Sequence, residues 1–279
     1  MPLRSLIVKK ETLHEDNYDQ KFATTGYVVK EEIILKAPVN GRISAIAPEG
    51  KKIKKGAEAF KIKANSDEKE YSVTAEKSGI FFQSVDGYES FLRYGEAETI
   101  GFFFSLPNTI EDQLNKSDYY QAGDNVGKIV NNLKAMQLLV KVPSSYLETS
   151  ELKIGSNLIF IIKELTREIS FKLIDYLDKQ EEIVLLLQTE DVREFLTGRR
   201  EVEVEFISAR RKGMLVSQKS LVVKEEKTGL YILNKGIVVW REVEIIEELD
   251  EDFVLIEPLP VFTEIISNPK FTKEGRFVY

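Results

Sequence analysis

An internal repeat in the first half of the chain limits what that half can fold into. Ala37-Pro-Val-Asn-Gly41-Arg-Ile43 is echoed by Ala75-Glu-Lys-Ser-Gly79-Ile-Phe81, with the two glycines 38 positions apart. In each copy, strand-type residues flank a glycine, which permits a turn with positive φ. Further glycine turns before strands follow each copy, at Gly56 and at Gly123. Two similar halves in the same order predict one small β-sandwich built by a pseudo-twofold.

The rest of the chain is also predicted to be mainly β. Short runs rich in Val, Ile and aromatic residues recur between Gly, Pro, Asn or charged turns. Residues 201–207 alternate charged and apolar side chains, as a strand with one solvated face does. Helical periodicity is limited to short windows at 108–119 and 144–151. The longest apolar runs, such as Leu158–Ile162, have five residues, whereas a membrane-spanning helix needs about 20.

The composition excludes several classes of chemistry. The chain has no cysteine and one histidine, His14, which excludes thiol nucleophiles, disulfides, zinc–thiolate sites and Ser-His-Asp triads. The 46 acidic and 39 basic residues give a net charge of −7, which argues against a nucleic-acid partner. Together with the family resemblance described below, these exclusions predict a protein that is not an enzyme, with no catalytic residue, no metal site and no cofactor.

Several motifs occur in the order found in one protein family. Lys36-Ala-Pro-Val-Asn-Gly41, followed by 48–56, resembles the first half of a biotinyl/lipoyl-type domain. Val140-Lys-Val-Pro143 is similar to the start of a β-barrel domain, and residues 213–222 look like a membrane-proximal domain. Over roughly residues 25–260, the chain resembles the HlyD family of membrane fusion (periplasmic adaptor) proteins.

Two further motifs narrow the resemblance to a hairpin-poor variant of that family. Asp86-Gly-Tyr-Glu89 and Gly123–Ile129 look most like a subgroup found in bacteria with a single membrane. The family's coiled-coil hairpin lies between the lipoyl halves. In this chain the connection, Lys63–Glu70, is too short for paired helices at 3.6 residues per turn.

The resemblance implies an elongated chain of three β domains. A lipoyl/biotinyl-like barrel-sandwich hybrid is expected at 31–133. A β-barrel domain is expected at 134–210, with residues 13–30. A membrane-proximal β domain is expected at 211–279, with residues 1–12.

The resemblance also implies an adaptor subunit of an export, efflux or secretion system, located outside the cytoplasm in the cell envelope. The expected partners are an inner-membrane transporter or other envelope protein and further copies of the chain. Membrane contact is expected only through an N-terminal anchor that this chain does not contain. The candidate partner contacts are basic residues around the junction of the last two domains: Arg199, Arg200, Arg210, Arg211 and Lys212.

Two alternatives stay open. Lys69 lies near the tip of the turn joining the lipoyl halves, where a carrier domain presents its biotinyl- or lipoyl-modified lysine. Its neighbours, Asn65-Ser-Asp-Glu, lack the Met-Lys-Met or Asp-Lys-Ala pattern of modified tips, which favours a solvated turn lysine. The second alternative is a purely structural envelope scaffold that serves no transporter.

Overall fold

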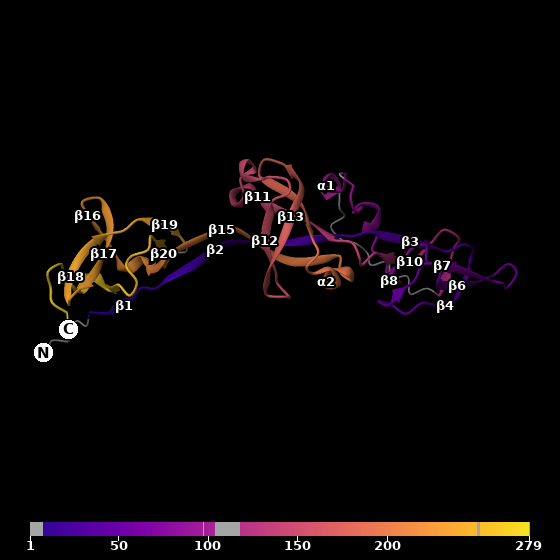
Figure 1. Cartoon of the computed structure of the whole chain (residues 1–279), viewed down its shortest axis with the longest axis horizontal. Helices are drawn as coiled ribbons and strands as arrows, with labels where there is room; N and C mark the ends of the chain where they lie inside the picture. Colours follow the sequence, from indigo (N-terminus) through magenta and orange to yellow (C-terminus); the bar gives the residue numbers. More distant parts are fainter. Residues whose placement is uncertain (1–7, 97, 104–117, 250–251, 279) are drawn as a thin grey trace. The chain divides into compact units, whose positions relative to one another are not determined.

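The computed structural model is mainly β (Figure 1), which confirms the predicted fold class. It describes residues 8–96, 98–103, 118–249 and 252–278. Within these residues the two α-helices, α1 (Glu98–Phe102) and α2 (Arg193–Thr197), have five residues each. None of the helices in the described residues has the length and hydropathy needed to cross a bilayer.

The chain divides into two compact units. Unit 1 comprises Met1–Gln20 and Ala209–Tyr279, and unit 2 comprises Lys21–Ser208. Two long strands, β2 (Glu15–Val29) and β15 (Glu201–Ser217), contribute residues to both units. Each unit therefore has its own core, and the two units are described separately below.

Two four-stranded sheets form the sandwich of unit 2. Their strand orders are β3-β10-β8-β5 and β7-β6-β4-β9, and the pairings within them are antiparallel. The strands are β3 (Glu32–Lys36), β4 (Gly41–Ile46), β5 (Lys52–Ile53), β6 (Glu58–Ala64), β7 (Glu70–Thr74), β8 (Gly79–Phe82), β9 (Tyr119–Tyr120) and β10 (Asn125–Val130).

The two sheets are related by the pseudo-twofold that the repeat predicts. The equivalent strands are β3 and β7, β4 and β8, β5 and β9, and β6 and β10. Exchanging the two members of every pair converts one sheet order into the other. The loop hydrogen bonds repeat in the same way. Gly56 N–H donates to the Ala75 carbonyl and Gly123 N–H donates to the Ala37 carbonyl, each over 2.8 Å. The sequence repeat is thus a structural repeat.

Gly41 and Gly79 mark close backbone approaches, and the expectation of a positive φ at these two glycines is wrong. The positive-φ glycines lie instead in the loops, among them Gly56 and Gly123. A Cβ at Gly41 would lie 2.2 Å from the carbonyl oxygen of Lys63, and a Cβ at Gly79 would lie 2.4 Å from that of Val130. Only a residue without a Cβ fits at either start of a strand.

The core of the sandwich lies between its sheets. Inward side chains from both halves are fully or almost fully buried and form one apolar cluster. Its largest members are Phe60, Phe81 and Tyr120, each at most 2% exposed. The alternation of inward apolar and outward polar residues along β6 follows from the pleat of a strand.

Six strands close into a barrel in the remainder of unit 2. The order β12-β13-β14-β11-β2-β15 is closed by pairing of β12 with β15. Inside it, the rings of Phe160, Phe171 and Phe206 pack with centroids 5.1–5.7 Å apart. The strands not yet given are β11 (Met136–Pro143), β12 (Asn157–Ile162), β13 (Arg167–Asp178) and β14 (Glu182–Thr189).

The structure describes only one of the two windows of helical periodicity in full, and that window is not a single helix. Most of 108–119 lies outside the described residues; Tyr119, at its end, belongs to β9. The window 144–151 contains two 3₁₀ turns, Ser144–Tyr146 and Thr149–Glu151, instead of one helix. The leucine between these turns, Leu147, is buried in the barrel core and has extended backbone angles, so a continuous helix does not form.

Unit 1 is built around a sheet in which β17 pairs with β16, β18 and β21, and β1 extends the sheet from β21. Apolar clusters on this unit include buried Leu230, Ile265 and Val238. Its strands are β1 (Lys10–Thr12), β16 (Leu221–Lys224), β17 (Lys227–Asn234), β18 (Ile237–Glu242), β19 (Ile245–Glu248), β20 (Phe253–Ile256) and β21 (Glu264–Ile266).

Candidate functional site: a buried ion cluster

Six charged side chains meet inside unit 2 where the sandwich adjoins the barrel. Three are cations and three are carboxylates, so their formal charges balance. All but one have a side-chain exposure of 9% or less, and the exception, Asp86, is 17% exposed. We call this set the ion cluster: Lys30, Glu32, Asp86, Glu89, Lys128 and Arg200.

The turn Asp86-Gly-Tyr-Glu89 presents two of the carboxylates. Gly87 adopts a φ of 81° before a 3₁₀ turn at Tyr88–Ser90. The Tyr88 N–H donates to the Asp86 carboxylate over 3.0 Å, and the Asp86 N–H donates to Glu89 over 3.2 Å. Tyr88 is itself buried beside Tyr27 of β2, with ring centroids 5.8 Å apart. The turn is therefore fixed from within and by the barrel.

Lys128 and Arg200 hold the carboxylates together. The Lys128 Nζ lies 2.7 Å from Glu89, 3.0 Å from Asp86 and 3.0 Å from Glu32. Arg200 donates from Nε to Asp86 over 3.0 Å and from Nη2 to Glu32 over 2.6 Å. Its Nη1 donates to the Val28 carbonyl of β2 over 2.8 Å. Arg200 thus joins the start of β15 to both the sandwich and β2.

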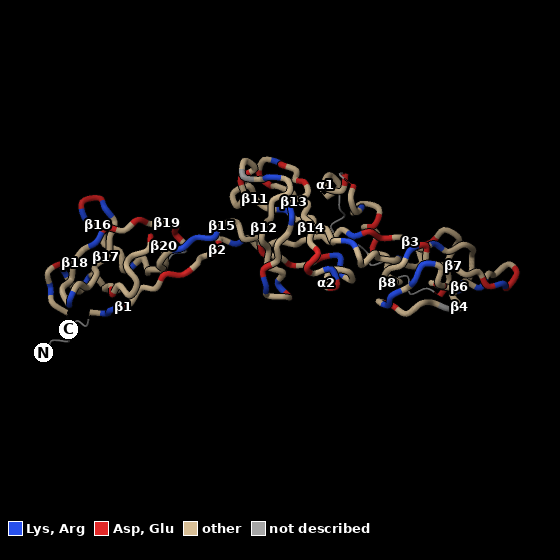
Figure 2. The backbone as a smooth tube through the Cα atoms, viewed as in Figure 1, with Lys and Arg blue, Asp and Glu red and all other residues tan. Residues whose placement is uncertain are grey.

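Lys30 ties the chain between β2 and β3 to the loop after α2. Its ammonium donates to the carbonyls of Thr197 and Arg199, each over 2.8 Å, and lies 3.9 Å from Glu32. Figure 2 shows the basic and acidic residues that follow one another at the start of β3. Burial lowers the pKa of Lys30 to about 7, against the opposing effect of Glu32.

The pKa values of Asp86, Lys128 and Arg200 are shifted in favour of their charged forms. Burial alone would raise the pKa of Asp86, but Arg200 and Lys128 outweigh it and lower the pKa to about 2. Burial would lower the pKa of Lys128 and of Arg200, but Glu32 and Asp86 act in the opposite direction and both pKa values are raised. The cluster is therefore a mutually stabilised set of charges.

The Asp86 pKa leads to a prediction about acid stability. Because the pKa of Asp86 in the folded state lies below its ordinary value of 3.8, the stabilisation is present above about pH 4 and is lost as the pH falls through about 2. We expect the urea midpoint of the wild-type chain to fall across this window. Asp86→Asn should lower the midpoint at pH 7 and flatten its dependence on pH between 4 and 2. An equally steep acid dependence in the variant would contradict this assignment.

The basic residues expected to contact partners differ in exposure. Arg200 is buried in the ion cluster, whereas Arg199 is exposed, with its guanidinium 3.8 Å from the centre of the Phe195 ring. In unit 1, Arg210 pairs with Asp19 over 2.9 Å.

Two further candidates and Lys69 are solvent-exposed. Arg211 lies 3.8 Å from Glu247, and Lys212 is exposed beside it on β15. Lys69 is 75% exposed in the turn between β6 and β7, with its Nζ 3.6 Å from Asp67. The expected position of Lys69 at the junction of the two halves agrees with the strand order.

Sequence reasoning did not identify Lys30, Glu32 or Lys128 as parts of a site. A signal is present for the two lysines, because each adjoins apolar residues in a strand-type run. Lys30 follows Tyr27-Val-Val29, and Lys128 lies in Val126-Gly-Lys-Ile-Val130. A lysine in such a run is rarely buried unless it has partners. The sequence contains no corresponding indication of which carboxylates those partners are.

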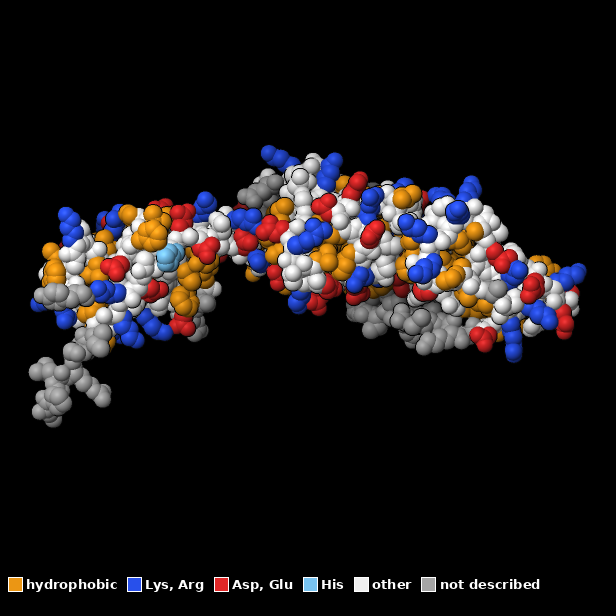
Figure 3. Space-filling view, turned by 60° about the horizontal axis from the view of Figure 1, so that its bottom comes forward, with side chains coloured by type: hydrophobic (Ala, Val, Ile, Leu, Met, Phe, Trp, Pro, Cys, Tyr) orange, Lys and Arg blue, Asp and Glu red, His pale blue; other side chains and the backbone are white. Residues whose placement is uncertain are grey.

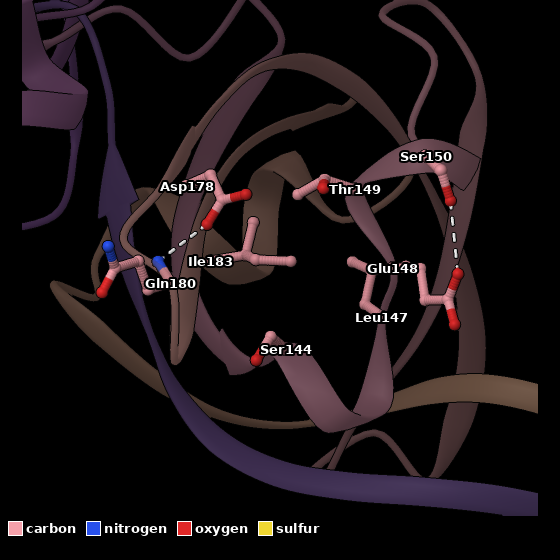
Figure 4. Close-up of a pocket in the computed structure, with 8 residues that line it drawn as sticks. All are labelled: Ser144, Leu147, Glu148, Thr149, Ser150, Asp178, Gln180 and Ile183. Atoms are coloured by element: carbon pink, nitrogen blue, oxygen red, sulfur yellow. Dashed lines mark hydrogen bonds between the residues drawn. The ribbon is translucent and has the colours of Figure 1, made fainter.

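A pocket of about 620 Å³ lies at one end of the barrel, away from the ion cluster. Figure 4 shows Asp178 and Glu148 on opposite sides of it, with Leu147 and Ile183 between them. Asp178 accepts a hydrogen bond from the Gln180 N–H over 2.8 Å, and Glu148 accepts one from the Ser150 hydroxyl over 3.3 Å. Both carboxylates therefore stabilise the turns that form the rim.

Across the described ranges, no three His, Cys, Asp or Glu side chains are grouped so that they could hold a metal ion. In the ion cluster, the three carboxylates are already bridged by Lys128, whose ammonium occupies the position between them. Their negative charge is thereby compensated by protein groups.

A comparison with protein families identifies the sandwich. Residues 32–131 match the model of the family described as RND related, barrel-sandwich hybrid domain. The resemblance found in the sequence is confirmed for this part of the chain. No curated protein sequence matches the chain.

Three solved structures are similar to about two thirds or more of the chain. ZneB from Cupriavidus metallidurans is 10% identical, with 96% of this chain and 94% of that chain covered and a TM-score of 0.40. MacA from Actinobacillus actinomycetemcomitans is 11% identical, with 92% of this chain and 99% of that chain covered and a TM-score of 0.44. The membrane fusion protein Spr0693 from Streptococcus pneumoniae R6 is 10% identical, with 66% of this chain and 98% of that chain covered and a TM-score of 0.38. At these identities and scores, the matches do not establish a common function.

Proposed function

We propose that the protein is a non-enzymatic adaptor of a cell-envelope export system that acts through protein–protein interfaces. The observation that carries the proposal is the RND-related barrel-sandwich hybrid at residues 32–131, with its two halves related by a pseudo-twofold. The solved structures similar to this chain include one titled a membrane fusion protein and one titled a putative efflux transporter. An adaptor needs stable surfaces and no catalytic group.

The proposal includes a division into three domains: 31–133, 134–210 with 13–30, and 211–279 with 1–12. Separate apolar cores support it. One core lies between the sheets of the sandwich, a second fills the barrel, and others lie in unit 1. We assign contact with an inner-membrane transporter or other envelope protein to unit 1, and contact with further copies to the sandwich and the barrel.

Unit 1 has exposed apolar side chains that suit such a contact. Val223, Val261 and Phe262 are 68%, 64% and 71% exposed. Phe262 also adopts a φ of 64°, a conformation that is costly for a bulky residue. On the face of unit 1 visible in Figure 3, apolar side chains lie between basic and acidic ones. Apolar groups rimmed by charge are typical of protein interfaces.

The experiment that tests the proposal is photo-crosslinking in cells that express the full-length protein. We expect a photoreactive amino acid in place of Val261 to give covalent adducts with an integral membrane transporter, identified by mass spectrometry. The same amino acid in place of Lys69 is the matched control and should give none with the transporter. Adducts of position 261 only with envelope proteins unrelated to transport would favour a structural scaffold instead.

One observation favours a second candidate function, that of a carrier. Lys69 is exposed in a hairpin turn between the two halves of a lipoyl-like fold, which is where a carrier would need its modified lysine. The neighbouring residues do not match a modification motif, and we expect the intact mass of the protein isolated from its source to equal that of the unmodified chain. An added biotinyl or lipoyl mass on Lys69 would overturn the adaptor proposal.

A further inference from the structure

A cavity of about 190 Å³ lies beside the ion cluster in unit 2. Its wall includes the side chains of Lys30, Lys128, Arg200, Asp86 and Ser84. The volume is below the roughly 300–1,000 Å³ of sites for drug-sized ligands. Any occupant other than water is therefore a small molecule or ion.

The charge on the cavity wall is positive although the ion cluster as a whole is neutral. Three cations line the cavity and only one carboxylate, Asp86, does so. Glu32 and Glu89 compensate the cations from outside the lining. Because the three cationic side chains are each at most 9% exposed, an anion in the cavity would interact with them more strongly than with lysines and arginines at an exposed surface.

Hydrogen-bond donors remain for such an anion. Lys30 has three N–H donors, and two are used by the carbonyls of Thr197 and Arg199. Arg200 has five, and within the described part of unit 2 three of them make the hydrogen bonds to Asp86, Val28 and Glu32. Ser84, which also lines the cavity, has a hydroxyl that can donate a further hydrogen bond. Lys128 donates hydrogen bonds to Asp86 and Glu89 and lies 3.0 Å from Glu32 in an ion pair.

We propose that this cavity is a binding site for a small oxyanion, such as phosphate, sulfate or a short carboxylate. The Lys30 ammonium, the Arg200 guanidinium and the Ser84 hydroxyl would hold it. Planar guanidinium and compact ammonium groups together are a common means of binding oxyanions. The inference concerns the interior of unit 2 and does not depend on the adaptor proposal.

Binding should be coupled to proton uptake by Lys30. The groups that face its ammonium are Glu32 from β3, Asp86 from the turn, Lys128 from β10 and Arg200 before β15. Burial holds the pKa of Lys30 at about 7, so at pH 8 most molecules carry a neutral amine. A bound anion favours the ammonium form, and affinity should therefore rise as the pH falls from 8 to 7.

The test is calorimetric titration of the full chain with sulfate, which does not titrate in this range, and in a separate experiment with inorganic phosphate. Chloride at the same ionic strength is the reference. We expect one site per chain and, at pH 8, a sulfate binding enthalpy that changes with the ionisation enthalpy of the buffer. Absence of saturable binding, or binding equal to that of chloride, would overturn the proposal.

Two variants and one control locate the site. Lys30→Met removes the ammonium, and Gly198→Leu fills space at the wall, where a Cβ would lie 3.7 Å from the Phe82 ring. Gly198 has a φ of −90°, so any residue fits its backbone. Each variant should weaken sulfate binding at least tenfold, while the exposed-lysine control Lys69→Met leaves it unchanged. Should Lys30→Met fail to fold, Gly198→Leu decides alone. Equal binding by Gly198→Leu and the wild type would place the anion elsewhere.

Discussion

Gly41→Ala and Gly79→Ala are expected to destabilise the sandwich to similar extents, by about 3 kcal/mol or more each. The new Cβ would lie 2.2 Å from a backbone carbonyl oxygen in the first case and 2.4 Å in the second. In both cases it would also lie 2.7 Å from the Cγ2 of a buried isoleucine. Backbone atoms cannot move aside as a flexible side chain can, so one of two paired strands must shift.

The measurement should separate the two units. The single tryptophan, Trp240, lies in β18 of unit 1, so its fluorescence reports on that unit. We expect its unfolding transition to stay in place, while hydrogen exchange in β4, β6, β8 and β10 becomes faster in both variants.

Gly198→Ala is the matched control for the two glycine variants. Its Cβ would be in ordinary contact distance, 3.7 Å from the Phe82 ring, and its φ is negative. A reduced entropy of the unfolded chain should leave its stability unchanged or slightly increased. A large effect at Gly41 with none at Gly79 would contradict the structural equivalence of the two halves.

Removing the ammonium of Lys128 is expected to cost about 3–5 kcal/mol, because Lys128→Met leaves Glu32, Asp86 and Glu89 short of positive charge in a buried site. The Lys128 ammonium lies 2.7–3.0 Å from all three carboxylates. Urea unfolding monitored by circular dichroism, with hydrogen exchange around the Asp86-Gly-Tyr-Glu89 turn, measures the loss.

Two comparisons make the Lys128 prediction specific. Lys163→Met removes an ion pair of 2.6 Å with Glu203, but both side chains are more than 60% exposed, so the loss of stability should be much smaller than at Lys128. Lys128→Met combined with Glu89→Gln removes one of the excess charges and should recover part of the loss. A cost at Lys128 as small as that at Lys163 would show that the ion cluster does not hold this region together.

The sandwich could be predicted because its information is local and is repeated. The two copies around Gly41 and Gly79 predicted a pseudo-twofold, and the strand orders of the two sheets confirm it. The role of these glycines was predicted wrongly. A glycine between strand-type residues is compatible with a turn and with a close approach, and only the position of the opposite backbone distinguishes them.

The ion cluster could not be predicted from the sequence, because its partners are far apart along the chain. Arg200 is 114 residues from Asp86 and 168 from Glu32. The sequence predicts both Arg199 and Arg200 as candidate partner contacts, since the two are adjacent and both basic. The structure separates them: the Arg199 guanidinium packs over Phe195, and the Arg200 guanidinium is buried.

By itself, the sequence determined the mainly β character of the chain, the twofold order of the sandwich and the absence of cysteine chemistry. These features depend on residue type and on spacing over a few residues, which the strand pleat and the turn translate directly into structure. Only the tertiary structure decided which charges are buried, which of them pair and where a cavity remains beside them. Burial and pairing depend on segments that folding brings together, and no local pattern specifies those contacts.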